Sequence, residues 1–422
     1  MKAVILAAGK GTRLRPLTDN TPKPMLMIAG RPLLEWTILR IKEAGIREIL
    51  VVTNYLEDQI KDYFKDGSEH DVKISYKTQK ETRGTANAFL QAREFVENSQ
   101  FMALYGDHYL TEGVLKRIKE NHKESEVAVA SLKVDDPSQY GAFKLDGEYI
   151  KKVVEKPDKG KEPSKYANVG IYIFPPGIFD YIEKTKKSPR GEYEITDTMQ
   201  LMMDDNILFK KHDIREEEWM DIGLPWTLLE ANERAMKEID FKIDGTVEDG
   251  AKLHGQVWVK KGAKIRSGAY IEGPVVIGEE CDIGPNCYIR PGTCLGKRVR
   301  VGNGCEVKNS IIGDESHAAH LSYIGDSIIG KNCNLGAGTV TANLRFDKTP
   351  IEVRVKGERL SSGRKKLGVI MGDKVETGIN VNIHPGVVIG TGAWIAPGIT
   401  LQRDVKGKVL KYFFSELKER PL

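Results

Sequence analysis

The sequence lacks the apolar runs of a membrane protein and the cysteine pattern of a secreted one. No apolar stretch approaches the ~18 residues that a membrane helix needs. The apolar run that starts at Ala3 is only about seven residues long, and Lys10 follows at once, so we expect a buried first strand rather than a signal peptide. The five cysteines are an odd number and all lie after residue 280, which excludes a secreted disulfide framework. These absences predict a cytoplasmic protein without a membrane segment.

A strong excess of charge of one sign is also missing. Lysine and arginine number 64 against 60 aspartates and glutamates, which leaves a net charge of +4 on 422 residues. So small an excess argues against a nucleic-acid-binding surface. Hydrophobic residues make up 40% and charged residues 29%, which is typical of a folded globular chain. We therefore expect small-molecule partners, with no nucleic acid and no membrane.

Residues 1 to about 225 alternate the patterns of strands and helices. Short runs of apolar and β-branched residues predict strands at Val4–Leu6, Glu48–Thr53 and Phe101–Tyr105. Apolar residues at helical spacing predict helices over 33–44, 57–65 and 226–239, the first ending at Gly45. This alternation predicts an α/β domain with parallel strands and crossover helices.

From Val247 the pattern changes to a six-residue repeat. Branched apolar residues stand at every sixth position in eleven consecutive units, from Val247 through Ile271 and Ile289 to Val307. The register slips by one residue near Ile312 and again near 329, and after an interruption over about 342–370 it returns. A six-residue period fits neither a helix nor a hairpin and is typical of a parallel β-helix, in which three sides of about six residues close one coil. The chain is thus predicted to form two domains, 1–239 and 240–422.

The cysteines fit this repeat. Four of them stand four residues after an apolar repeat position: Cys281, Cys287, Cys305 and Cys333. Alanines occupy the same place in other repeats, so the position takes a small buried side chain, as which a free cysteine serves well. The nearest pair is separated by five residues, which is not a zinc-site spacing, and we expect no metal there.

The first chemical motif runs from Gly9 to Lys23. It reads Gly9-Lys-Gly11-Thr-Arg13-Leu after the first predicted strand, followed by Thr-Pro-Lys23-Pro. Glycines allow a tight turn that presents backbone N–H groups to phosphate, and Arg13 and Lys23 add cations. The motif is no P-loop, and Leu14 stands where the dinucleotide fingerprint requires glycine. A phosphate site of another kind is therefore indicated.

These residues closely resemble the sugar-1-phosphate nucleotidyltransferase family, over the first 225 residues. The resemblance implies a Rossmann-like nucleotidyltransferase domain in which a sugar-1-phosphate, already an anion, attacks a nucleoside triphosphate without a general base. Arg13 and Lys23 would be catalytic, and Asp107 and Asp221 would hold Mg²⁺. The implied nucleotide-binding residues are Leu6, Ala8, Gly9, Gly11, Thr12, Gln79, Gly84 and Thr85. The implied sugar-phosphate residues are Gly141, Glu155, Lys156 and Asn168. For His108 we expect a structural role.

A second set of polar residues lies where the repeat register slips. The runs His320-Leu-Ser-Tyr-Ile-Gly-Asp326 and Asn334-Leu-Gly-Ala-Gly-Thr-Val-Thr-Ala-Asn343 strongly resemble the acetyltransferase half of the bifunctional N-acetylglucosamine-1-phosphate uridylyltransferase/glucosamine-1-phosphate acetyltransferase family. Residues 343–368 look more like its archaeal members. The resemblance implies a left-handed parallel β-helix of hexapeptide repeats, assembled as a homotrimer or a dimer of trimers.

In that family the repeat domain transfers an acetyl group from acetyl-CoA to an amine. The resemblance makes His320 the general base, and histidine suits this role because it titrates near neutral pH. Ala337 would contact acetyl-CoA. The implied acetyl-acceptor residues are Arg290, Lys308, Tyr323, Asn334 and Asn343.

Several points stay open on the sequence. Ile379 stands where the bacterial pattern has a serine that contacts coenzyme A, so that site is undefined beyond Ala337. The loop from Gln79 to Gly84 is closer to thymidylyltransferases, which leaves UTP or dTTP as the nucleotide. The sugar epimer and the role of His317 are also open.

The sequence thus predicts a bifunctional enzyme of UDP-N-acetyl-amino-sugar synthesis that uses Mg²⁺, acetyl-CoA, UTP or dTTP, and sugar-1-phosphates. One alternative is a monofunctional nucleotidyltransferase, such as a mannose-1-phosphate guanylyltransferase, with a non-catalytic repeat domain; the cluster from His320 to Asn343 counts against it. Another is a non-enzymatic regulatory subunit. The joint presence of Lys23, Asp107 and Asp221 counts against that alternative.

Overall fold

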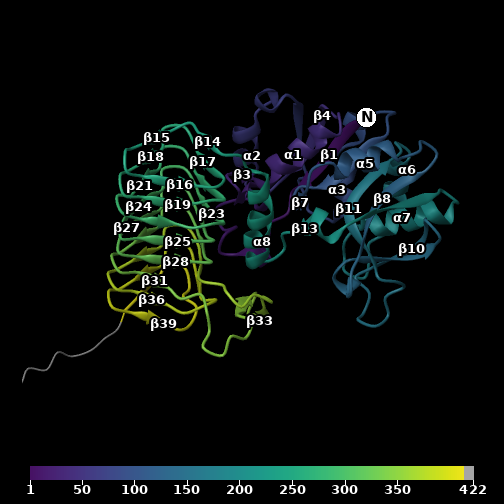
Figure 1. Cartoon of the computed structure of the whole chain (residues 1–422). Coiled ribbons are helices and arrows are strands. Elements are labelled where there is room, and N and C mark those ends of the chain that lie inside the picture. Colours follow the sequence, from purple (N-terminus) through teal and green to yellow (C-terminus); the bar gives the residue numbers. More distant parts are fainter. Residues whose placement is uncertain (413–422) are drawn as a thin grey trace, which may run out of the picture. The chain divides into compact units, whose positions relative to one another are not determined.

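The computed structural model describes residues 1–412 (Figure 1). The chain forms two compact units: Met1–Lys10, Pro22–Met25 and Leu33–Asp221 in the first, and Gly11–Thr21, Leu26–Pro32 and Ile222–Leu422 in the second. No helix within residues 1–412 is both long and apolar enough to cross a membrane. The contacts within the chain separate the two units after Asp221, so helix α8 (Pro225–Ala235) belongs to the second unit. A domain boundary at 239 stays a prediction.

A mixed nine-stranded sheet forms the centre of the first unit, in the order β5-β4-β1-β6-β11-β8-β12-β10-β9. Its strands are β1 (Lys2–Ala7), β4 (Glu48–Thr53), β5 (Lys73–Thr78), β6 (Phe101–Tyr105), β8 (Val127–Lys133), β9 (Gly141–Asp146), β10 (Tyr149–Glu155), β11 (Tyr166–Phe174) and β12 (Phe209–Ile214). The strands β5, β4, β1 and β6 run parallel, as the alternating pattern predicts. Strand β11 is antiparallel to both β6 and β8. Strands β9 and β10 lie between β8 and β11 along the chain and form a hairpin in place of a crossover helix. Because hairpin strands are antiparallel, the chain reverses its direction there before it enters β11.

Helices cover both faces of this sheet. They are α1 (Leu33–Glu43), α2 (Glu57–Phe64), α3 (Thr85–Leu90), α4 (Arg93–Val96), α5 (Val114–Glu120), α6 (Ile178–Lys184) and α7 (Ile195–Asp204). Successive residues of a strand point to opposite faces, so Ile5 packs in one core with Leu34 of α1, and Val4 packs in the other with Phe89 of α3. Burial on both faces explains why these strands read as continuous apolar runs.

The second unit is a parallel β-helix, whose coils are visible as stacked arrows in Figure 1. Three parallel sheets, of eight, nine and eight strands in the described residues, form its sides. Leu253 pairs with Ile271, 18 positions further on, and Ile271 pairs with Ile289. After the slip the partners are 17 positions apart, as in Val307 with Ile324. The predicted slips are therefore coils that are shorter by one residue.

The segment that interrupts the repeat extends away from the coils, after which the chain rejoins the stack. Strand β29 (Ile328–Ile329) pairs directly with β34 (Ile370–Met371), and the residues between them include a two-stranded hairpin of β32 (Glu352–Val355) and β33 (Glu358–Ser361). The stack of coils is thus continuous across the inserted segment.

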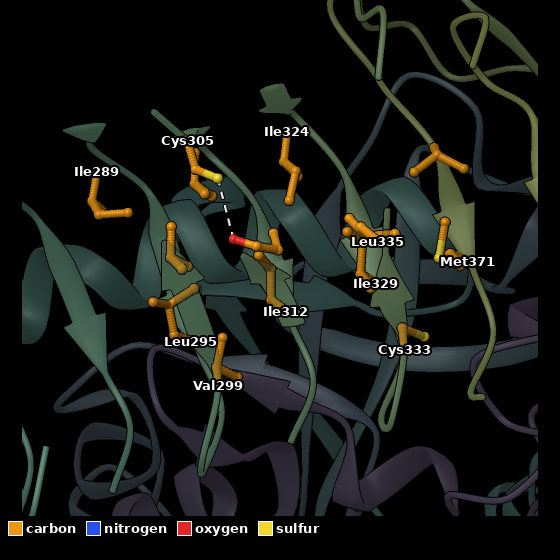
Figure 2. Packing of buried hydrophobic residues seen from close by; sticks show 14 of the residues in the cluster. Ile289, Leu295, Val299, Cys305, Ile312, Ile324, Ile329, Cys333, Leu335 and Met371 are labelled. Atoms are coloured by element: carbon orange, nitrogen blue, oxygen red, sulfur yellow. Dashed lines mark hydrogen bonds between the residues drawn. The ribbon is translucent and has the colours of Figure 1, made fainter. Parts of the chain in front are cut away.

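The apolar repeat residues form one buried core along the coils, part of which Figure 2 shows. Cys305 and Cys333 lie in it beside Ile312, Ile324 and Leu335. All five cysteines are free and buried, as predicted for Cys281, Cys287, Cys305 and Cys333, and the fifth is Cys294. The Cys305 thiol donates to the carbonyl oxygen of Ala318 at 3.1 Å, so its one donor is satisfied.

Candidate active sites

Asp107 and Asp221 lie at two short strands that pair with each other. Strand β13 (Trp219–Asp221) is antiparallel to β7 (His108–Leu110), which places Asp221 opposite His108. Asp107 directly precedes β7. The ammonium of Lys23 lies 2.5 Å from Asp107 Oδ2 and 3.6 Å from Asp221 Oδ1. The structure therefore brings together these three residues from distant parts of the sequence.

Charge pairing keeps the carboxylate of Asp107 ionised. Lys23 is 7% exposed, whereas the Asp107 side chain keeps 32% of its surface exposed. Burial alone would raise the pKa of Asp107, but the charge of Lys23 and hydrogen bonds to the carboxylate lower it to about 2. Burial lowers the pKa of His108, which favours a neutral ring. That ring packs edge-on against Trp219, 5.1 Å between centroids, in keeping with a structural role.

The donor set of this site fits Mg²⁺. Magnesium prefers oxygen ligands and takes most of them from phosphate and water, so that one or two carboxylates suffice. No group of three or more His, Cys, Asp or Glu side chains that could hold a metal gathers within the described part of the chain. Two carboxylates are as many protein ligands as Mg²⁺ needs when phosphate and water supply the rest.

The glycine-rich motif is divided between the two units. Leu6, Ala8 and Gly9 belong to the first unit and lie at or after the end of β1, whereas Gly11–Thr21 belong to the second. Gly11 has φ +58° and precedes a short 3₁₀ turn over Thr12–Leu14, and its carbonyl accepts from the Thr18 hydroxyl at 2.9 Å. The roles of Thr12 and Arg13 at phosphate stay predictions.

The loop from Gln79 to Gly84, expected to contact the nucleotide, follows β5 and is held by partly buried polar contacts. Gln79 is 3% exposed, and its side-chain amide donates to Asn87 Oδ1 at 2.9 Å. Gly84 has φ +114°, and a Cβ there would lie 2.4 Å from the carbonyl oxygen of Tyr193. Thr85 Oγ1 accepts from the N–H of Ile195 at 2.9 Å. Gly84 and Thr85 therefore dock the loop onto the segment before α7, in addition to any contact with a nucleotide.

The expected sugar-phosphate residues meet where β9, β10 and β11 approach one another. Gly141 lies opposite Glu155 in the sheet, and a Cβ on Gly141 would lie 3.3 Å from both Asn168 Cβ and Glu155 Oε2. Gly141 is therefore packed closely between these residues, and a side chain there would push them apart. Lys156 follows Glu155, and its N–H donates to the carbonyl of Tyr140 at 2.9 Å.

Two further residues complete this cluster that the sequence analysis did not find. Thr196 of α7 donates to Glu155 Oε2 at 3.3 Å, and Arg190 lies 3.4 Å from Glu155 Oε1. Both come from the segment around the start of α7, which carries no motif. These two residues can be recognised only from their distance to Glu155 in the folded chain.

In the β-helix, one buried carboxylate gathers three of the expected acetyl-acceptor residues. Strand β25 (Glu306–Lys308) stacks on β28 (Tyr323–Gly325), so that Lys308 pairs with Gly325. Asp326 is 2% exposed and accepts from Lys308 Nζ at 2.8 Å and from Asn343 Nδ2 at 2.5 Å. Asn343 Nδ2 also lies 3.2 Å from the Tyr323 hydroxyl. Asp326 is the last residue of the run that begins at His320. That it accepts hydrogen bonds from Lys308 and Asn343 becomes visible only in the stacked coils.

Arg290 lies on the same side of the β-helix. It follows strand β22 (Tyr288–Ile289), which stacks on β25. Its guanidinium donates to Glu306 Oε1 at 2.8 Å and lies over the ring of Tyr288, 5.5 Å from the centroid. Arg290 Nε is buried without a hydrogen-bond partner in the described residues.

His320 lies on a different side of the coil. It ends strand β27 (His317–His320), whose His317 pairs with Asn334 of the next coil. The ring of His320 is exposed and forms no hydrogen bond or ion pair within residues 1–412, while its carbonyl accepts from the Gly338 N–H, next to Ala337, at 3.4 Å. The structure thus brings Lys308, Tyr323 and Asn343 together, and places His320 apart from them, on the side of the coil whose strand β27 stacks on the strand of Asn334.

Comparisons with known proteins give a family match in each half of the chain. Residues 2–238 match the family model described as nucleotidyl transferase, and residues 271–378 match one described as the GMPPB C-terminal domain. The chain is 41% identical to the "Bifunctional protein GlmU" of Methanocaldococcus jannaschii over 100% of both chains. It is 43% identical to the "Bifunctional sugar-1-phosphate nucleotidylyltransferase/acetyltransferase" of Sulfurisphaera tokodaii, over 96% of this chain and 98% of that protein. A crystal structure of UDP-glucose pyrophosphorylase complexed with UDP-glucose shares 28% identity at a TM-score of 0.51, covering 56% of this chain and 98% of that one.

Proposed function

This chain belongs to the family of bifunctional sugar-1-phosphate nucleotidylyltransferases/acetyltransferases, and on that premise we propose the two reactions that it catalyses. In the first, acetyl-CoA acetylates the amine of glucosamine-1-phosphate or galactosamine-1-phosphate. In the second, the acetylated sugar-1-phosphate attacks the α-phosphate of UTP or dTTP, and pyrophosphate leaves. We propose that both reactions take place in the cytoplasm.

The nucleotidyl-transfer half rests on Lys23 between Asp107 and Asp221. The attacking phosphate is already an anion, so the site has to position two anions and neutralise their charge rather than remove a proton. Lys23 offers a buried, fixed ammonium for phosphate oxygens. The two carboxylates would hold Mg²⁺, which when bound supplies further neutralising charge at the α-phosphate. Glu155 and Asn168, on either side of Gly141, are suited to hydroxyl groups of the sugar.

The acetyl-transfer half rests on the polar cluster around Asp326. Lys308 and Arg290 supply cations for the phosphate dianion of the acceptor. The amine must lose a proton as it attacks the thioester carbonyl, and we assign this proton to His320 as general base. Because His320 lies on another side of the coil than Lys308, a second copy of the chain completes the site in our proposal. We therefore propose a homotrimer or a dimer of trimers.

A matrix of substrates tests this function. The purified protein is incubated with acetyl-CoA and each amino-sugar-1-phosphate, and thiol release is followed. In parallel, each acetylated sugar-1-phosphate, and mannose-1-phosphate, is combined with UTP, dTTP or GTP, Mg²⁺ and pyrophosphatase, and phosphate release is followed. We expect thiol release with at least one amino sugar, and phosphate release with UTP or dTTP. Absence of acetyl transfer with every acceptor, combined with a preference for GTP and mannose-1-phosphate, would contradict the proposal.

A further inference from the structure

Three residues with positive φ are stacked at the corner that follows the acetyl-acceptor strands. They are Gly292 at φ +81°, Asn309 at +45° and Asp326 at +48°, each 17 positions after the previous one. Asparagine and aspartate are the side chains that best tolerate this backbone region. The stacking brings Asn309 Nδ2 to 2.9 Å from Asp326 Oδ1. The shorter coil thus places an amide directly beside the carboxylate that holds the acceptor cluster.

Helix α8 contacts this corner with two consecutive side chains. Asn232, fully buried, donates to the carbonyl of Gly292 at 2.8 Å. Glu233 Oε1 accepts from Asn309 Nδ2 at 2.8 Å. The same Glu233 oxygen accepts from Arg364 Nη2 at 2.6 Å, which fixes the carboxylate in place. The helix therefore holds the same amide nitrogen of Asn309 that contacts Asp326.

The amide of Asn309 has two N–H groups, and both are used. One donates to Glu233 and the other to Asp326. Asp326 in turn holds Lys308 and Asn343, and as a buried carboxylate it needs its hydrogen-bond partners to stay in place. A continuous chain of hydrogen bonds thus runs from α8 to the acceptor cluster.

We propose that Glu233 of α8 is a positioning residue for the acetyl acceptor, acting through Asn309 on Asp326 and so on Lys308 and Asn343. The inference rests on the proposed acetyl-transfer function. Without Glu233 the Asn309 amide is free to turn, and Asp326 loses a fixed donor. Lys308 then no longer has one defined position for the acceptor's phosphate. The effect falls on acceptor binding, because His320 and Ala337 lie outside this chain of contacts.

Steady-state kinetics on full-length variants test the proposal. We compare Glu233→Ala and Asn309→Ala with Glu230→Gln, which alters the same helix near Arg364 (3.6 Å) but lies outside the hydrogen bonds to Asn309. We expect the KM for the amino-sugar-1-phosphate to rise about 10-fold in both alanine variants, a typical effect of removing a supporting residue. The kcat, the KM for acetyl-CoA and nucleotidyl transfer should stay at wild-type values. Glu230→Gln should match the wild type throughout.

The double variant separates positioning from general loss of stability. Because Glu233 and Asn309 act along one path, removing both should raise the KM no further than removing either. Glu233→Gln keeps an oxygen for Asn309 and should restore most of the affinity. An unchanged acceptor KM in Asn309→Ala overturns the proposal, and so does a joint fall of kcat and nucleotidyl transfer. If the wild-type protein transfers no acetyl group, the proposed function itself is wrong, and this inference, which rests on it, is wrong as well.

Discussion

At the scale of single residues, both candidate sites are built around a buried charge that has partners on more than one side. Lys23 lies between two carboxylates, and Asp326 accepts from Lys308, Asn309 and Asn343. Burying a charge without partners costs several kcal/mol, so such groups are held firmly where their partners are. Residues fixed in this way are preorganised for phosphate and need little rearrangement when a substrate binds.

Glu218 gives a pH-dependent prediction at the same scale. It directly precedes β13 and accepts from Arg117 at 2.8 Å and from the Arg215 N–H at 2.8 Å. Burial would raise its pKa, but these donors lower it from 4.5 to about 2. Since the folded pKa lies below the unfolded one, the stability that the carboxylate contributes is present above pH 4.5 and is lost as the pH falls towards 2.

Glu218→Gln should therefore destabilise the protein by about 1–3 kcal/mol near neutral pH, as measured by chemical unfolding. The difference from the wild type should shrink as the pH approaches 2. The neighbouring Glu217, with 66% of its side chain exposed, provides the control variant Glu217→Gln, which should change little. A difference that does not depend on pH would show that the glutamate charge plays no part.

The catalytic motifs could be predicted residue by residue, but their partners could not. Lys23, Asp107 and Asp221 each stand in a recognisable run, and the structure brings them together. Asn309 and Asp326 become visible as partners only when the coil length is known to be 17 residues at that point, and Glu306 becomes visible as the partner of Arg290 only when the preceding coil is known to have 18. A partner one coil away is defined by the stacking and not by its neighbours in sequence.

At the scale of elements, the repeat could be predicted most completely, because one buried side chain per six residues fixes both the strand and its orientation. The order of strands in the first sheet could not. Each strand shows itself as an apolar run, but whether the next one returns by a helix or a hairpin decides its direction, as at β9 and β10. The hairpin of β32 and β33 could be predicted only as an interruption of the repeat, because the six-residue pattern does not continue through it.

The buried thiols provide a test of the β-helix core. Burial raises the pKa of Cys281, Cys287 and Cys333 to about 12, so these thiols carry almost no thiolate near neutral pH. We expect the native protein to be inert to an aromatic disulfide reagent at pH 8 and to release five equivalents per chain after unfolding in guanidinium. Rapid labelling of the native protein would contradict the packing of the coils.

At the scale of the whole molecule, the chain combines two units, each with a separate core and a separate set of candidate residues. The separation of His320 from Lys308 within one chain leads to the expectation of an assembly. Sedimentation equilibrium of the full-length protein should give three or six times the chain mass of 47.2 kDa. A monomer that acetylates at full rate would exclude an acetyl site shared between copies.

The most direct test of the two-site account assays both reactions in each of two variants. Asp107→Ala should abolish Mg²⁺-dependent nucleotidyl transfer and leave acetyl transfer unchanged. His320→Ala should lower acetyl transfer by about 10²–10⁴-fold, the contribution of a positioned base, and leave nucleotidyl transfer unchanged, while His254→Ala, which removes another exposed histidine of the β-helix, serves as its control. Loss of both reactions in either variant, or wild-type acetyl transfer in His320→Ala, would contradict the account.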